Sequence, residues 1–176
     1  MNKQTLLHMW DHIRQGNGIA LRVIALLPAD KLDSHPIPNM RTPKELVVHL
    51  YHDVLKALAE GVSRGDVAID MSRETEKKIC AGIRSRDELL AFARDCWSAA
   101  DQAVASITDA QLAAEVKTPF GRNFPGFILL GTLNDEFLHH RGQLYTFARA
   151  LGAAPPMMWD FGGNEPAFQP KAQAWV

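Results

Sequence analysis

Four long stretches of the sequence repeat apolar residues with the 3.6-residue period of an α-helix, and they constrain the fold more than any other feature. The first covers residues 6–27 and ends at Pro28, because proline cannot continue a helix. The second runs from the Thr42-Pro43-Lys44-Glu45 segment to about Arg64, and this opening is typical of an N-cap, an N1 proline and a capping-box glutamate. The third and fourth cover residues 85–107 and 127–151. With no convincing set of alternating strands between them, the sequence predicts an all-α fold, a four-helix bundle.

The length of 176 residues fits one domain, so residues 1–176 are expected to form a single helical bundle. Gly152 is a plausible C-cap of the last helix, and the prolines and glycines beyond it predict an irregular C-terminal tail. The tail also carries four aromatic residues, which indicate that it packs against the bundle: Trp159, Phe161, Phe168 and Trp175.

The composition is that of an ordinary soluble protein, with 47% apolar residues, 22% charged residues and a formal net charge of −1. This balance gives no electrostatic reason to expect a nucleic acid or an anionic membrane as a partner. We find neither a signal peptide nor an apolar run of membrane-spanning length. Cys80 and Cys96 match no zinc, redox or disulfide pattern and are expected to pack as small apolar residues. A cytoplasmic protein is therefore the simplest expectation.

The most informative polar residues lie within the last helical stretch. Glu136 and His140 are four residues apart, so a helix brings both side chains to one face, about one turn apart. At about 100° per residue, His140 lies within roughly 20–40° of the centre of the apolar face, and Glu136 lies roughly 60° from it. His139 lies about 120° away on the other side and is expected to look sideways or outward. An ionised carboxylate directed toward a core needs a partner, because burying an unpaired charge costs several kcal/mol.

That partner is either a metal ion or another side chain. Two imidazoles and one carboxylate suit a borderline divalent ion such as zinc, nickel or ferrous iron, and they leave coordination positions open for water and substrate. The plainer alternative is a satisfied pair of Glu136 and His140, reinforced by Arg141 or by a group on another helix. The spacing alone does not decide between these readings.

Other histidines occupy more polar positions. His8 and His12 also stand four apart, but they lie away from the apolar face and are expected on the surface or in a subunit contact. His49 and His52 belong to the polar side of the second helix, and periodicity alone predicts that both are solvated.

Two segments resemble a known family. The run His139-His140-Arg141-Gly142-Gln143-Leu144, followed by residues 147–152, resembles the last-helix signature of the DinB/YfiT-like metalloenzymes. The run Pro43-Lys44-Glu45-Leu46-Val47-Val48-His49-Leu50 is similar to the family segment that carries the first histidine ligand. The resemblance spans nearly the whole chain in helix order and spacing, and it implies the same kind of four-helix bundle.

The resemblance implies three metal ligands: His49, Glu136 and His140. The family usually has a histidine where this chain has Glu136, although a carboxylate is also a competent ligand. His52 and His139 are the spare candidates. Among the neighbouring residues, Arg141 is expected in a surface or interface ion pair, with an anionic substrate or Glu136 as the alternative partner. Gln143 is a candidate hydrogen-bond partner of a ligand, and Gly142 is expected to allow close helix packing or access to the site.

Characterised relatives include transferases and isomerases that use mycothiol or bacillithiol. The resemblance therefore implies a divalent-metal-dependent enzyme, such as a low-molecular-weight-thiol S-transferase or a related hydrolase or isomerase. A non-catalytic metal- or ligand-binding stress-response protein is the alternative, and an inactive bundle lacking a needed histidine is a third. Relatives often dimerise, and helix two carries surplus apolar surface, so we predict a homodimer.

Overall fold

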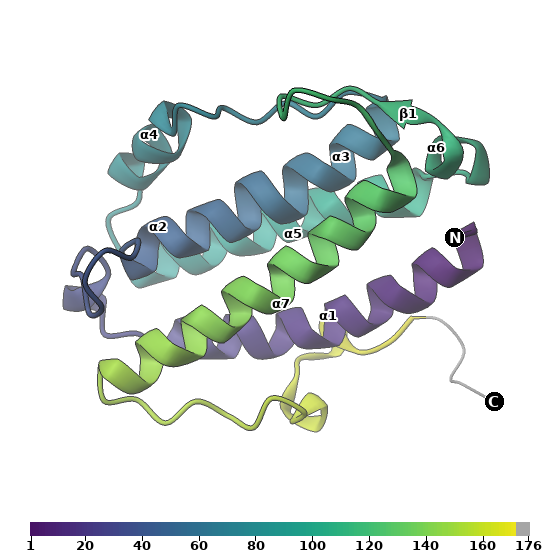
Figure 1. The fold of residues 1–176 in the computed structure, drawn as a ribbon. Helices are drawn as coiled ribbons and strands as arrows, with labels where there is room; N and C mark the ends of the chain where they lie inside the picture. The colour runs from purple at the N-terminus through teal and green to yellow at the C-terminus, as the bar shows by residue number, and fades with distance from the viewer. Residues whose placement is uncertain (172–176) are drawn as a thin grey trace.

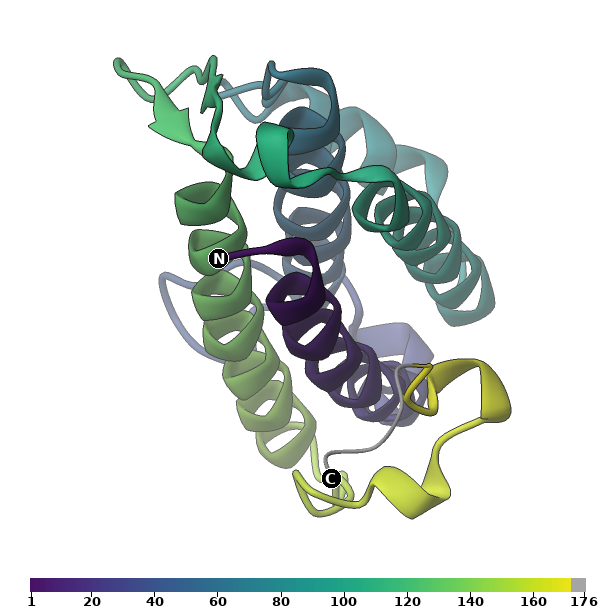
Figure 2. The ribbon, with the colours of Figure 1, turned by 90° about the vertical axis from the view of Figure 1, so that its right-hand side faces the viewer.

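The computed structural model describes residues 1–171 and forms a bundle of four long helical rods (Figure 1). The first is α1 (Lys3–Leu26), the third is α5 (Arg86–Ser106) and the fourth is α7 (Gly126–Ala150). The second rod is continuous and combines α2 (Pro43–Val48), a π-helical segment η2 (His49–Lys56) and α3 (Ala57–Arg64). The first rod packs on α5 and α7, and the second rod also packs on α5 and α7, which closes the bundle (Figure 2). The all-α fold and the four-helix bundle are confirmed.

The helix ends follow the capping signals in the sequence. Thr42 and Glu45 exchange both hydrogen bonds of a capping box at the start of α2, and Pro43 occupies the first turn. Gly65, with φ of 80°, takes the left-handed conformation that ends α3. Ser85 accepts a hydrogen bond from the backbone N–H of Glu88 and begins α5. The bounds of the rods were therefore predictable from local chemistry.

Shorter elements close the two ends of the bundle. The 3₁₀ turn η1 (Ala29–Lys31) and α4 (Glu74–Gly82) lie near the start of α2, whereas α6 (Asp109–Ala113) lies at the opposite end (Figure 1). Strands β1 (Glu115–Val116) and β2 (Phe124–Pro125) form an antiparallel hairpin before α7. Two further 3₁₀ turns, η3 (Phe161–Gly163) and η4 (Pro166–Phe168), lie in the tail.

The core is largely apolar and includes a buried polar contact between α1 and the second rod. Trp10 of α1 stacks on Trp97 of α5, with ring centroids 4.8 Å apart. Tyr51 is fully buried, and its hydroxyl donates a 2.6 Å hydrogen bond to Oδ1 of the equally buried Asn17. This bond joins the second rod to α1.

The tail packs against α1, as its aromatic residues indicate. Phe168 is 4% exposed and lies against Trp97, whereas Trp159 remains 53% exposed. Asn164 donates a 2.8 Å hydrogen bond to the carbonyl of Gln15. It fits there because Gly18 has no side chain, since a Cβ at Gly18 would lie 2.6 Å from the Asn164 amide carbon. Trp175 lies outside the described residues. Within residues 1–171, no helix is both long and apolar enough to cross a membrane.

Candidate metal centre

The second rod and α7 bring the three predicted ligands together. His49 begins the π-helical segment, and Glu136 and His140 occupy successive turns of α7. Each of these residues offers one potential ligand atom, and the three atoms all lie within 4.8 Å of one another. The rings of His49 and His140 meet edge to face, with centroids 4.8 Å apart. The structure thus places these residues in one cluster, as the resemblance implies.

His140 is held in the state that a metal ligand requires. Its ring is 5% exposed, and its Nδ1 lies 2.9 Å from Oε1 of Gln143. Because an amide oxygen can only accept, Nδ1 carries the proton and Nε2 keeps its lone pair. Burial is the main cause that lowers the pKa of His140. The hydrogen bond with Gln143 raises this pKa by a smaller amount, and the nearby His49 lowers it further, so the ring is neutral near pH 7.

The free nitrogen of His140 faces a carboxylate. Nε2 is buried and, among residues 1–171, has no hydrogen-bond partner, although Oε2 of Glu136 lies 3.1 Å away. That contact satisfies the distance of an ion pair but lacks the geometry of a hydrogen bond. Two acceptor atoms so close together repel unless a proton or a cation lies between them. The donor set therefore fits a divalent cation.

His49 is oriented in the same way by an acidic neighbour. Its Nδ1 lies 3.0 Å from Oδ2 of Asp53, so Nδ1 donates and Nε2 remains as a potential ligand. The other oxygen of Asp53 accepts from Nδ1 of His52 at 2.7 Å. Burial would raise the pKa of Asp53, but the two histidine hydrogen bonds outweigh it and lower the pKa to about 2. Asp53 is thus ionised at neutral pH and holds both rings.

A second group of possible ligands shares His49 and consists of His49, Asp53 and Glu76. Glu76, in α4, is only 2% exposed and is paired with Arg73 at 2.5 Å and with Arg41 at 3.3 Å. Its charge is therefore already balanced by two guanidinium groups, and that of Asp53 by hydrogen bonds from two histidines. Among residues 1–171, Nε2 of His140 and the carboxylate of Glu136, whose side chain is 44% exposed, have no comparable hydrogen-bond or ion-pair partners. We assign the candidate site to that group.

The position of His49 differs from the prediction of periodicity alone. The imidazole is about 21% exposed instead of solvated, and it faces another helix. A helical wheel assumes regular α-geometry, whereas residues 49–56 form a π-helix with wider turns. The wheel also assumes that a polar face meets water. Here His49, on the polar face of the second rod, lies near Glu76 of α4 and His140 of α7.

A polar pocket of about 530 Å³ adjoins the cluster. His140 and Gln143 line it from α7, and three side chains from the other wall are Arg41, Glu45 and Arg73. The volume is in the range of pockets that hold small-molecule ligands. The candidate centre therefore has space beside it for a substrate.

The neighbours of His140 depart from the predictions in part. His139 is exposed, as expected, and accepts a 2.9 Å hydrogen bond from Gln143. Gln143 contacts a candidate ligand, as predicted. The prediction of a surface or interface ion pair for Arg141 is wrong, because this side chain is 5% exposed and packs over the ring of Phe137. Close packing does not explain Gly142, since a Cβ there would meet nothing within 4 Å.

The remaining chemistry-bearing residues lie apart from the cluster. His12 is exposed, and its ring lies near those of Trp159 and Phe161 in the tail. Burial raises the pKa of Cys80 to about 11 and that of Cys96 to about 12, which disfavours the thiolate form of either residue. Both thiols are free. The expectation that they have no reactive role stays a prediction.

The fold and the cluster define a class: a four-helix bundle with a histidine and carboxylate group of metal-ligand type between two of its helices. The family model of the DinB superfamily matches residues 12–144, and the chain belongs to this superfamily. No curated protein matches the chain.

Solved structures share the fold. A DinB-like protein from Bacillus subtilis superposes with a TM-score of 0.69 and 18% identity, over 86% of this chain and 96% of that one. The mycothiol-dependent maleylpyruvate isomerase superposes with a TM-score of 0.63 and 18% identity, over 96% of this chain. This chain spans only 66% of the isomerase. A variant of that isomerase with a histidine-to-alanine substitution gives a TM-score of 0.64 at 16% identity, over 96% of this chain and 66% of the variant.

Proposed function

We propose that this protein is a divalent-metal-dependent enzyme that acts on a low-molecular-weight thiol, most simply as a thiol S-transferase. The observation that carries the proposal is the buried, unpartnered Nε2 of His140, which faces Glu136 at 3.1 Å. The similarity in fold to an isomerase that depends on mycothiol supports the thiol as a substrate class.

In this proposal His49, Glu136 and His140 hold zinc, nickel or iron. When bound, such a cation lowers the pKa of a thiol or water beside it, which makes a nucleophile available at neutral pH. Asp53 accepts a hydrogen bond from Nδ1 of His49, and Gln143 accepts one from Nδ1 of His140, so the opposite nitrogen of each ring stays free. The adjoining pocket, with Arg41, Glu45 and Arg73 on its wall, admits a small polar substrate.

The first test is metal content, measured by elemental mass spectrometry on protein purified without a metal-affinity tag. We expect about one metal ion per chain in the wild type, and its loss in His140→Ala. His139→Ala is the matched control, because it removes the adjacent but exposed imidazole and should keep the metal. No metal in the wild type after reconstitution, or equal metal in His140→Ala, would refute the site.

The second test separates an enzyme from a metal-binding protein. Wild type and His140→Ala are incubated with a thiol and an electrophile, and the loss of free thiol is followed with a chromogenic disulfide. Consumption by the wild type alone supports the enzyme. Tight metal binding without turnover across thiols and electrophiles supports the non-catalytic alternative.

A further inference from the structure

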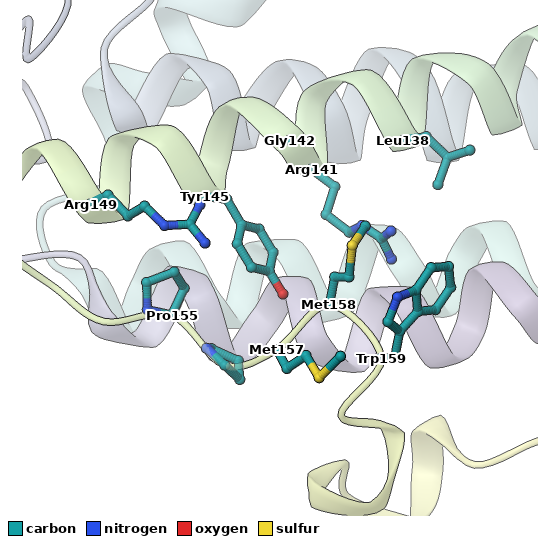
Figure 3. A pocket seen from close by; sticks show the side chains of 10 residues that line it. Leu138, Arg141, Gly142, Tyr145, Arg149, Pro155, Met157, Met158 and Trp159 are labelled. Atoms are coloured by element: carbon teal, nitrogen blue, oxygen red, sulfur yellow. The ribbon is translucent and has the colours of Figure 1, made fainter.

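A second pocket, of about 460 Å³, opens beside α7 and involves none of the candidate metal ligands. One wall comes from α7 and the other from the start of the tail, residues 155–159. Figure 3 shows Arg141, Tyr145 and Arg149 extending from α7 toward the segment that carries Met157, Met158 and Trp159. The sequence gives no indication of this pocket, because its two walls come from α7 and from a segment predicted to be irregular.

Arg141 places a buried cation beside this pocket. The residue is 5% exposed, yet within residues 1–171 its guanidinium has no hydrogen-bond or ion-pair partner; it packs over the ring of Phe137, with the guanidinium carbon 5.7 Å from the ring centroid. A glycine on α1 makes room for it, since a Cβ at Gly16 would lie 2.7 Å from Nη1 of Arg141. None of its nitrogens is among the fully buried atoms without a partner in residues 1–171, so the guanidinium meets solvent in the pocket and can donate to an anion there.

Tyr145 supplies a second unused group. It is 8% exposed, and its hydroxyl is buried with no hydrogen-bond partner in the described part of the chain. Burial raises the pKa of Tyr145, so the hydroxyl keeps its proton and can donate. Arg149, which also lines the pocket, lies over the ring of Tyr145 at 5.4 Å. Asp160, which follows Trp159 in sequence, does not supply the anion for these groups, because its carboxylate is already paired with Arg22 at 2.5 Å.

The rest of the wall is apolar and open to solvent. The exposed fractions are 39% for Leu138, 45% for Met158, 53% for Trp159 and 70% for Met157. Methionines and a tryptophan around a polar end group are typical of a surface that accommodates an apolar ligand body. The pocket therefore combines two donors at its inner side with apolar surface at its mouth.

We propose that this pocket binds a small organic anion with an apolar body and a terminal carboxylate. Arg141 and the Tyr145 hydroxyl donate to the carboxylate, Arg149 adds positive charge, and Met157, Met158 and Trp159 contact the apolar body. The pocket faces the opposite side of α7 from His140 and Gln143, so the ligand is distinct from a substrate at the candidate metal centre. This site does not depend on the function proposed above.

The test is titration calorimetry of the full chain with octanoate, and with 1-octanol as the neutral ligand of equal length. We expect octanoate to bind at least about tenfold more tightly than 1-octanol, since a hydrogen bond to a charged group contributes more than one between neutral groups. Arg141→Met keeps the apolar length of the side chain and removes the charge, so octanoate affinity should fall at least about tenfold. Tyr145→Phe should weaken it by a smaller factor.

Two controls distinguish a binding role from a structural one. Arg84→Met removes an exposed arginine and should bind octanoate as the wild type does. Arg141→Met should not lower the midpoint of urea unfolding, because it removes an uncompensated buried charge. His140→Ala should lose metal but keep octanoate affinity. Metal content therefore tests the proposed metal centre, and octanoate affinity tests the proposed pocket, each without the other.

Three results would overturn the proposal: no octanoate binding by the folded wild type, equal affinity for octanoate and 1-octanol, and unchanged octanoate affinity in Arg141→Met. If the wild type does not bind octanoate and sediments as a dimer, whereas Arg141→Met sediments as a monomer, a second copy of the chain covers the pocket instead.

Discussion

The carboxylate of Asp53 offers a sharp perturbation, because it accepts hydrogen bonds from two histidines of which only one is a proposed ligand. Its oxygens lie 3.0 Å from Nδ1 of His49 and 2.7 Å from Nδ1 of His52. Asparagine has the same shape but only one acceptor oxygen, so Asp53→Asn cannot accept from both rings. It also removes a charge that is present at neutral pH, since the pKa of Asp53 is about 2.

The expected magnitude follows from what Asp53 does for His49. Loss of a partner that orients a ligand histidine typically weakens metal binding about 10- to 100-fold, or about 1.4 to 2.7 kcal/mol. Zinc at about 1,000 times the wild-type Kd stabilises the fold by about 4.1 kcal/mol, and a 100-fold weaker site retains about 1.4 kcal/mol. For a domain of this size, the zinc-induced rise in Tm should drop from about 8–16 °C to about 3–6 °C.

The assay compares Tm with and without zinc at fixed protein and metal concentrations, together with Kd from competition against a chelating dye. Asp135→Asn is the matched control, because it removes the same charge from an exposed position next to Glu136. A zinc affinity in Asp53→Asn equal to that of the wild type, while His140→Ala loses the metal, would refute the role of Asp53. An equal loss in Asp135→Asn would show that net charge alone accounts for the effect.

Three further predictions concern the fold and its assembly. Tyr51→Phe removes the 2.6 Å bond to Asn17 and should lower the free energy of unfolding by about 1–3 kcal/mol in urea denaturation, because it leaves a buried amide oxygen unpaired; an unchanged value would argue against that bond. Burial raises the pKa of Asp101, but hydrogen bonds from Arg14, Lys171 and Trp10 outweigh it and hold the pKa at about 2, against an ordinary value of 3.8. The stability from this depressed pKa is complete above pH 3.8 and is lost as the pH falls through about 2, so Asp101→Asn should cost about 1 kcal/mol at pH 6 and almost nothing near pH 2. If the protein is a homodimer, sedimentation at micromolar concentration should give the molecular mass of two chains; the mass of one chain would contradict this prediction.

The helices could be predicted from the sequence because their start and stop signals are local. Thr42 and Glu45 cap the second rod through contacts within four residues, and Gly65 ends it through its own backbone conformation. The π-helical segment could not be predicted in the same way. Residues 49–56 have no proline or glycine to mark a change of helix type, and the segment packs against α5 and α7, which lie far from it in sequence.

The candidate site was predictable only where one helix supplies both partners. The spacing of Glu136 and His140 indicates a pair, whereas the placement of His49 beside them came from resemblance. The second pair, His49 and Asp53, was missed even though its residues also stand four apart, because both lie on a face that periodicity assigns to water. Glu76 was missed because α4 is too charged to suggest burial, and only the fold brings Arg41 and Arg73 to it.

The run from His139 to Gln143 is recognised as one motif, but the structure divides it between two faces of α7. His140 and Gln143 line the polar pocket beside the candidate metal, whereas Arg141 and Gly142 line the pocket against the tail. Adjacent residues on a helix point about 100° apart, so neighbours in sequence can serve separate sites. A double-mutant cycle with His140→Ala and Arg141→Met tests this separation. If the sites are independent, zinc binding should respond only to the first change and octanoate binding only to the second, and the double variant should show both effects at the size found in the single variants. A change in zinc affinity in Arg141→Met, or loss of octanoate binding on removal of zinc, would show that the two faces act as one site.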